Sequence, residues 1–426
     1  MYPSVRDSFL TPADSQVAAG RRALSMRVSS NVVFLGLTSL FTDVSSEMVN
    51  AILPIYLTFE LRFSPLQFGL FDGLYHGVTA ILRLAGGLIA DRLQNHKSVA
   101  AIGYSLSVGC KLALLAAANA WLWAMGILFL DRLGKGIRTA PRDALISLSA
   151  ARANLAEAFG LHRAFDTAGA CLGPVLAFCV LGFAPGAFDA VFVVSFCAAV
   201  IGLGVLVVFV ENRGGALDRI TTGSAVSLRA ALRLLRVPRF RTLAFVGTVL
   251  SLATVSDSFV YLTFQRRAHI DPMFFPLLYV GTAAVYLLLS VPVGRLADRA
   301  GRGRVFIAGY VLLLGLYGTL LVAAPGAGAL ICGVVLFGAY YAATDGVLMA
   351  LASEVVPGHL RTSGFALLTT AVAVARFVAA VLFGALWSWQ GPEWTVVFFV
   401  VALGTVIPLA ALGLSRRSRE PASEMV

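Results

Sequence analysis

Apolar runs of about 20 residues recur along almost the whole chain, and they restrict the possible folds more than any other feature. A run of this length spans the hydrocarbon core of a bilayer when it is coiled as an α-helix. The short alternating segments that are typical of membrane β-barrels are missing from the sequence. The composition agrees, with 58% hydrophobic residues, 13% charged residues and a mean hydropathy of +0.85. We therefore predict an all-α integral membrane protein.

The apolar runs predict 12 transmembrane helices in two six-helix bundles. One long polar segment, residues 211–240, divides the runs into equal halves and is predicted to be a cytoplasmic linker. Residues 31–210 and 241–415 are then the two bundles, and residues 1–30 and 416–426 are tails. The spans are expected near residues 31–58, 66–90, 98–119, 121–142, 158–183, 188–210, 241–265, 273–296, 304–324, 328–351, 364–388 and 394–414.

The two halves repeat each other in sequence. YLTF occurs at residues 56–59 and again at residues 261–264. GGLIADRLQNHK, at residues 86–97, is matched by VGRLADRAGRGR at residues 293–304. Both copies of this second motif close the second span of their half. Internal duplication of this kind is typical of many secondary transporters.

Lysine and arginine are concentrated in alternate loops, which predicts the orientation of the chain. If both termini are cytoplasmic, the loops on the outside hold only Arg62, Arg266 and Arg267. We therefore predict a multi-pass protein of the cell membrane with cytoplasmic termini. The net charge of +11 reflects this asymmetry, so we do not expect nucleic acid as a partner. The five cysteines lie in apolar runs without CxxC or zinc spacing, so we expect no disulfide, metal or cofactor.

Three short motifs give the chain a resemblance to a known family. After the second span of each half, a glycine precedes an Asp-Arg pair by four residues, and basic residues follow. The fourth span has an arginine four residues before a glycine, and the fifth has a Gly-xxx-Gly-Pro sequence. With these motifs the chain resembles the major facilitator superfamily over essentially its whole length, and in particular its 12-span proton-coupled exporters, the drug/H+ antiporter-like branch. The motif residues are Gly87, Asp91, Arg92 and Lys97, their counterparts Gly294, Asp298, Arg299, Gly301, Arg302 and Arg304, then Arg132 and Gly136, and finally Gly169, Gly173 and Pro174.

The first motif is predicted to form a cytoplasmic gate. Its glycine lets two helices approach closely, and its carboxylate faces helix ends and cations. The resemblance implies a latch that stabilises one access state, and simple anchoring by positive charge is the alternative. Gln94 stands where the family has a glycine, so the copy in the second half matches better.

The fourth span is more basic than the family pattern, with Lys135 in place of a glutamine and Arg138 in place of a glycine. An unpaired arginine at this depth costs at least about 2.5–3.5 kcal/mol, so Arg132 is expected to have a partner. Asp131 and the carboxylates of the first span are the candidates. The resemblance links Arg132 to proton transfer, and a structural ion pair is the alternative.

Glycines four residues apart in the fifth span predict tight helix packing, and the proline after them predicts a bend. Such packing is common in membrane bundles. Within this architecture, the motif resembles one that is characteristic of exporting antiporters. It therefore favours export over import.

Charged residues inside the spans are expected to face a wet cavity or each other. The resemblance implies that spans 1, 4, 7 and 10 line a central cavity, and the alternative for each residue is an ion pair that fixes helix packing. The candidates for proton coupling or the cavity are Asp43, Glu47, Arg132, Asp166, Asp257 and Asp345. The candidates for the substrate cavity are Asn50, Asp72, His76, Arg83, Lys111, Tyr261, Tyr340, Tyr341 and Arg376.

These features together predict a secondary transporter that works by alternating access. Proton-coupled efflux of a small organic compound is the leading hypothesis. Export or exchange of an organic anion, such as a metabolite or siderophore, is the alternative, because the spans hold many cations. The sequence has no HExxH or GxSxG motif, so we do not expect an enzyme. The expected partners are a small-molecule substrate, protons and the lipid bilayer, and we expect a monomer.

Overall fold

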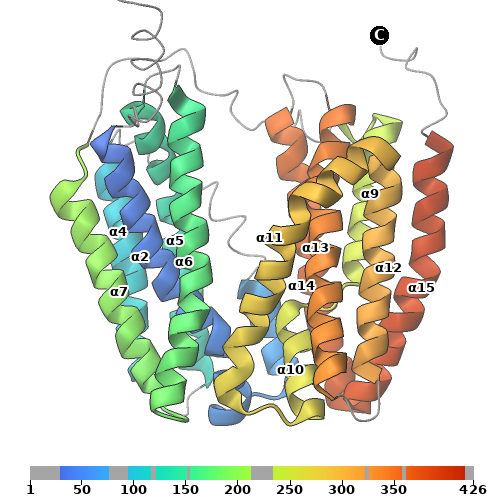
Figure 1. Cartoon of the computed structure of the whole chain (residues 1–426), viewed down its shortest axis with the longest axis horizontal. Helices are drawn as coiled ribbons and strands as arrows, with labels where there is room; N and C mark the ends of the chain where they lie inside the picture. The colour runs from blue at the N-terminus through green and yellow to red at the C-terminus, as the bar shows by residue number, and fades with distance from the viewer. Residues whose placement is uncertain are drawn as a thin grey trace, which may run out of the picture.

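The computed structural model describes residues 29–75, 95–116, 121–150, 154–212, 234–321, 326–356 and 361–417. Every regular element within these residues is a helix, which confirms the all-α prediction (Figure 1). The first bundle holds α2 (Ser30–Ile55), η1 (Tyr56–Glu60), a helical segment over 65–75, α4 (His96–Leu115), α5 (Trp121–Ser149), α6 (Leu155–Phe183) and α7 (Phe188–Phe209). The second holds α9 (Pro238–Leu252), α10 (Asp257–Ala268), η3 (Pro272–Phe274), α11 (Phe275–Ala300), α12 (Arg302–Leu321), α13 (Ala327–Val355), α14 (Arg361–Gln390) and α15 (Pro392–Arg417).

Ten helical stretches in the described part of the chain are long and apolar enough to cross a membrane, which makes this a multi-pass membrane protein. Each overlaps a predicted span. Of the two remaining predicted spans, one lies largely outside the described residues. The other is α5, which is 29 residues long but carries four charged side chains between Asp131 and Arg138. The total of 12 spans therefore stays a prediction.

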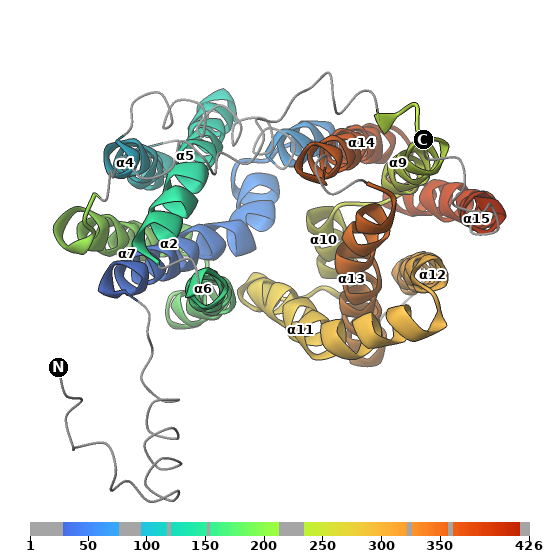
Figure 2. The same cartoon turned by 90° about the horizontal axis from the view of Figure 1, so that it is seen from above.

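The helices form two groups that stand side by side (Figures 1 and 2). Seen from above, α6 of the first bundle neighbours α11 of the second (Figure 2). α9 begins at Pro238, just inside the predicted linker. A proline at the first helical position loses no backbone bond, because that N–H has no partner within the helix, so the helix begins at this residue rather than after it.

The glycines of the fifth predicted span bring α6 against α2 at the two acids of α2. A Cβ atom placed on Gly169 would lie 2.6 Å from the Leu40 carbonyl oxygen and 3.0 Å from Asp43 Cβ. One on Gly173 would lie 2.8 Å from both the Val44 carbonyl oxygen and Glu47 Cβ. The helices therefore pack backbone to backbone, as small residues allow in membranes. The expectation of tight packing by this motif is met.

The first span of the second bundle is broken, although one continuous helix was expected. α9 ends at Leu252 and α10 begins at Asp257, in a stretch rich in residues that favour caps and turns over helix interiors. The break exposes backbone groups that would be costly in a membrane. Tyr317, which is fully buried, bonds two backbone groups within the break. Its hydroxyl accepts from the Val255 N–H at 2.7 Å and donates to the Ala253 carbonyl at 3.1 Å.

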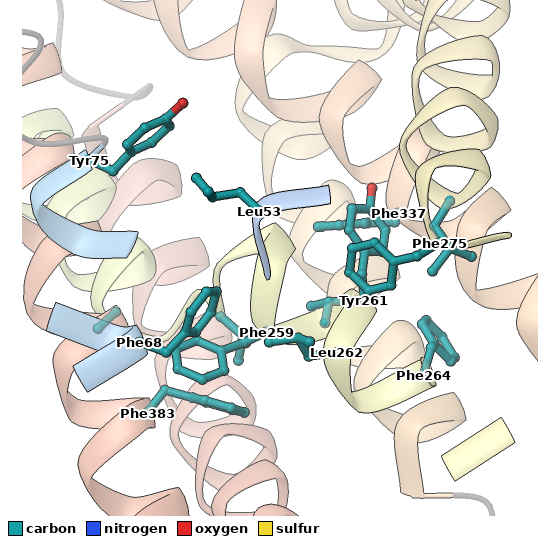
Figure 3. Packing of buried hydrophobic residues seen from close by; sticks show 14 of the residues in the cluster. Leu53, Phe68, Tyr75, Phe259, Tyr261, Leu262, Phe264, Phe275, Phe337 and Phe383 are labelled. Atoms are coloured by element: carbon teal, nitrogen blue, oxygen red, sulfur yellow. The ribbon is translucent and has the colours of Figure 1, made fainter. Parts of the chain in front are cut away.

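The two bundles close on each other at the end opposite the start of α2 and the end of α15. Figure 3 shows Phe68 of the first bundle beside Phe259 and Phe383 of the second. The ring centroids of Phe68 and Phe259 are 5.0 Å apart, and those of Phe259 and Phe383 are 4.7 Å apart. Towards the other end, where α2 begins and α15 ends, the helices of the two groups diverge (Figure 1). The aromatic contacts thus form the floor of the space between the bundles.

We predict that Gly173→Ala lowers the free energy of unfolding by about 1–3 kcal/mol, because the added methyl group meets backbone atoms of α2 that cannot move aside cheaply. The measurement is the apparent melting temperature of the purified protein in detergent. Gly160→Ala is the matched control, since it lies on the same helix with nothing within 4 Å of a Cβ atom. Equal melting temperatures for the two variants would contradict the packing role.

Candidate functional site

Two adjoining cavities lie between the bundles. The first, of about 400 Å³, is lined by the α9–α10 break, by α13 and α14, and by residues 72–73. The second, of about 560 Å³, is lined by α2, α5, α10 and the helical segment over 65–75. Asp72, Asp257 and Thr369 belong to the walls of both. The cavities are therefore parts of one central space with a wall from each bundle.

The wall from the second bundle presents Asp257, Asp345 and Arg376. Asp257 is placed by the helix break, as the first residue of α10, and its carboxylate accepts a short hydrogen bond from the Tyr341 hydroxyl. Asp345 lies well inside α13 yet is exposed, because the cavity opens beside it. Among the described residues, neither Asp345 nor Arg376 forms an ion pair, and the buried Nε of Arg376 has no hydrogen-bond acceptor.

The wall from the first bundle presents Glu47, Lys135 and Arg132. Glu47 and Lys135 are half-buried, and within the described part of the chain neither belongs to an ion pair. The charges of Glu47 and Asp43 both act on the Lys135 ammonium. Lys135 is thus a cation close to both acids of α2, while Arg132 also lies in the field of Glu47 and Arg138 in that of Asp43.

Arg132 is held by its neighbour in the sequence. Its Nη2 lies 2.7 Å from Asp131 Oδ2, and Lys111 Nζ lies 2.9 Å from Asp131 Oδ1. All three side chains are almost completely buried. The guanidinium of Arg132 also lies 4.0 Å from the ring centroid of Tyr75, whose hydroxyl bonds Asn50. Of the two kinds of partner considered for Arg132, the structure pairs it with Asp131.

The two acids of α2 have different surroundings. Glu47 faces the cavity, whereas Asp43 faces α6 and lies close to the Asp166 carboxyl. Asp166 accepts from Ser39 Oγ at 2.5 Å and lies 3.8 Å from Arg142 Nη1. Neither Asp43 nor Asp166 is among the residues that line the central cavities. The predicted proton-coupling set is therefore divided between a cavity wall and a helix interface.

The structure divides the predicted substrate-cavity residues as well. Lys111, Tyr261 and Tyr340 lie in bundle interiors rather than at the cavity, because each side chain is fully buried, Lys111 against Asp131 and both tyrosines among aromatic rings. The members of this set that line the cavity are Asn50, Asp72, Tyr341 and Arg376. The predicted residues that lie outside the described part of the chain are His76, Arg83, Gly87, Asp91 and Arg92.

The gate motif of the second bundle forms contacts within that bundle. Asp298 lies 2.8 Å from Arg302 Nη2, and Arg302 Nη1 lies 2.7 Å from Glu354 Oε1, so α11, α12 and α13 are joined. Gly301, with φ of 102°, turns the chain between α11 and α12. A Cβ atom on Gly294 would meet nothing within 4 Å, so the close helix approach expected there is not observed. Gly294 lies in the last part of α11, which ends at Ala300, and the helices of the two bundles diverge at that end (Figure 1). Arg299 of the same copy is exposed. In the first copy, Lys97 Nζ bonds the Val207 carbonyl at 2.9 Å.

Two site features were missed by sequence reasoning. Lys135 was counted among the cations of the spans and as a departure from the family pattern, but its position facing Glu47 depends on how α5 rotates against α2. The helix break at residues 253–256 carried a signal in Thr254, Val255 and Ser256, since such residues favour non-helical backbone. That signal was hidden within an apolar run.

Comparison with known proteins identifies the family. The sequence profile of the Major Facilitator Superfamily matches residues 35–280 and 243–424. The chain belongs to the Major Facilitator Superfamily. It is 31% identical to an uncharacterised MFS-type transporter of Methanocaldococcus jannaschii over 385 residues, which cover 87% of this chain and 92% of that protein. Members of the superfamily are transporters, so the chain is a membrane transporter.

Solved structures show the same fold. The nucleoside transporter NupG superposes with a TM-score of 0.75 at 13% identity, covering 90% of this chain and 99% of that one. A POT family transporter in complex with 5-aminolevulinic acid superposes with a TM-score of 0.73 at 11% identity. The match covers 92% of this chain and 97% of that one. At this identity the likeness establishes the fold alone.

We predict that Asp131→Asn lowers the free energy of unfolding by about 3–5 kcal/mol, because it leaves two cations buried without a counter-charge. Lys111→Met costs less, since Asp131 keeps Arg132. Apparent melting temperatures in detergent measure the order. Asp298→Asn, which removes an exposed ion pair, is the control and costs at most about 1 kcal/mol. A Lys111→Met variant less stable than Asp131→Asn would contradict the central role of Asp131.

Proposed function

We propose that this superfamily member exports a small organic compound in exchange for protons, by alternating access of the central cavity. The observation that carries the proposal is Glu47, a carboxylate on the cavity wall, beside Lys135 and without an ion-pair partner among the described residues. The protonation of a carboxyl group depends on its burial and on nearby cations. A movement of α5 against α2 changes both for Glu47.

The packing of α6 against α2 supports this reading of Glu47. Gly169 and Gly173 hold the backbone of α6 next to Asp43 and Glu47, so a rotation of either helix moves these acids relative to Lys135. The glycine motif also resembles the one of exporting antiporters, which favours export. Asp43, beside Asp166 and away from the cavity wall, is assigned to the mechanical coupling of the two helices.

Exchange of an organic anion is the second candidate function. The observation that favours it is the presence of Arg376 and Lys135 on the cavity walls, neither in an ion pair within the described part of the chain. The solved neighbours named for nucleosides and for peptides indicate that this fold accommodates chemically different substrates. The charge of the substrate therefore has to be argued from the cavity of this chain.

We predict that Glu47→Gln abolishes transport driven by a pH gradient, because the amide cannot bind and release a proton, while exchange of substrate at equal pH remains. The assay uses purified protein in liposomes with an imposed pH gradient and a mass-detected panel of organic cations, zwitterions and anions. Glu60→Gln, at the exposed end of the same span, is the matched control.

Gradient-driven accumulation by Glu47→Gln at the wild-type rate would overturn the assignment of the proton to Glu47. Wild-type transport of organic anions that is independent of the pH gradient would instead support the anion exchanger. Asp43→Asn in the same assay separates the two acids of α2, since it is expected to slow exchange and gradient-driven transport equally.

A further inference from the structure

The wall from the second bundle presents a cation and an anion that are not in direct contact, although the charge of each acts on the other. Asp345 on α13 and Arg376 on α14 line the same cavity of about 400 Å³. Among the described residues, neither belongs to an ion pair. Charges inside a membrane protein normally pair or mark the path of a substrate or ion. Two opposite charges that face one cavity without direct contact are therefore placed to bind two different groups of one ligand.

A singly charged ligand provides a counter-charge for only one of the two residues, Asp345 or Arg376. An organic cation at Asp345 would leave Arg376 without a counter-charge and close to the positive ligand. An organic anion at Arg376 would meet Asp345, Asp257 and Asp72 in the same cavity. Once a bound ligand has displaced water from the cavity, leaving one charge of the wall unpaired is the costly outcome. A ligand that carries both charges avoids it.

The geometry points to a small zwitterion as the substrate: we propose that its anionic group binds Arg376 and its cationic group binds Asp345, with Asp257 nearby. This inference rests on the proposed transport function and assigns the substrate class to its cavity. It also differs from the anion-exchange alternative, which rests on Arg376 and on Lys135 of the other wall.

The rest of the cavity defines the uncharged part of the ligand. Leu348, Met349, Val372 and Phe377 line it together with Tyr341, so an apolar side group fits between the two charged ends. The volume of the cavity is at the lower end of the range of about 300–1,000 Å³ for small-molecule sites. The substrate is thus of the size of an amino acid or a dipeptide with an apolar side chain.

The α9–α10 break contributes to the same wall. The helix break brings Thr254 and Ser256 to the cavity, and the buried Oγ of Ser256 has no hydrogen-bond partner among the described residues. A hydroxyl at this point can bond either end of a zwitterion. Because Tyr317 holds the break from within the bundle, this polar group is in place before a ligand arrives.

Matched sets of compounds test the charge requirement on purified full-length protein. L-phenylalanine, its methyl ester and 3-phenylpropanoic acid share one apolar group and differ in charge, and the dipeptide Phe-Ala with its ester and its deaminated form makes a second set. Isothermal titration calorimetry and melting temperatures measure binding. We expect a zwitterion to bind at least about tenfold more tightly than both singly charged members of its set.

Variants of the two charged residues have opposite expected effects. Arg376→Gln is expected to weaken binding of the zwitterion by about 30-fold and to leave binding of the ester unchanged or tighter. Asp345→Asn is expected to weaken binding of the zwitterion and to leave binding of the acid unchanged. Retained binding of the singly charged analogue shows that each variant is folded. Arg267→Gln, which lies outside both central cavities and faces Glu393, is the control and leaves all affinities unchanged.

Equal or tighter binding of the singly charged members, or no binding of any zwitterion, overturns the proposal. The proposed proton coupling is tested separately, because this assay has no pH gradient. Glu47→Gln is expected to keep the zwitterion preference, so a failed coupling assignment leaves that preference intact. If the wild-type protein shows no preference for the zwitterion but still transports in a pH gradient, only the proposed substrate class is refuted.

Discussion

The structure depends on the requirement that polar groups inside a bilayer find their partners within the protein. In the first bundle, Asp131 meets this requirement for two cations, Lys111 and Arg132, which lie in different helices. In the second bundle, Tyr317 meets it for the backbone of a broken helix. Because these groups are satisfied internally, the charges without ion pairs in the described residues stand out. Four of them, Glu47, Lys135, Asp345 and Arg376, line the central cavity, two from each bundle.

This arrangement separates two tasks that alternating access must combine. The wall of the first bundle holds a carboxylate next to a lysine on helices that pack through glycines, which suits a proton site that responds to helix movement. The wall of the second bundle holds an acid and an arginine beside apolar side chains, which suits recognition of a ligand. Asp72 and Asp257 belong to both cavities and connect the walls. Movement of one bundle against the other would therefore change the geometry of both walls.

Sequence reasoning predicted the class of fold because apolar length and period depend on local composition. It also predicted which glycines of the fifth span pack closely, since Gly-xxx-Gly places both on one helix face. It did not decide which of Asp43 and Glu47 lines the cavity, because residues one turn apart lie on the same face of a helix. Only the packed structure shows which acid remains at the cavity, because Glu47 belongs to the cavity wall whereas Asp43 lies beside Asp166 of α6. The sequence also placed Lys111 and Tyr261 at the cavity, although both side chains are buried inside their bundles. Their burial depends on neighbours from other helices, which a single span does not reveal.

The sequence by itself determined that this chain crosses the membrane many times, that its halves are duplicated, and that charged residues lie within its spans. The spans follow from the energy of moving side chains and backbone into hydrocarbon, which each segment meets on its own, and the duplication follows from motifs that recur in the chain. Only the tertiary structure decided which of those charges are neutralised and which face the cavity. Pairing depends on distances of a few ångströms between helices that are far apart in sequence, and those distances are set by how the helices rotate and approach in the packed bundle.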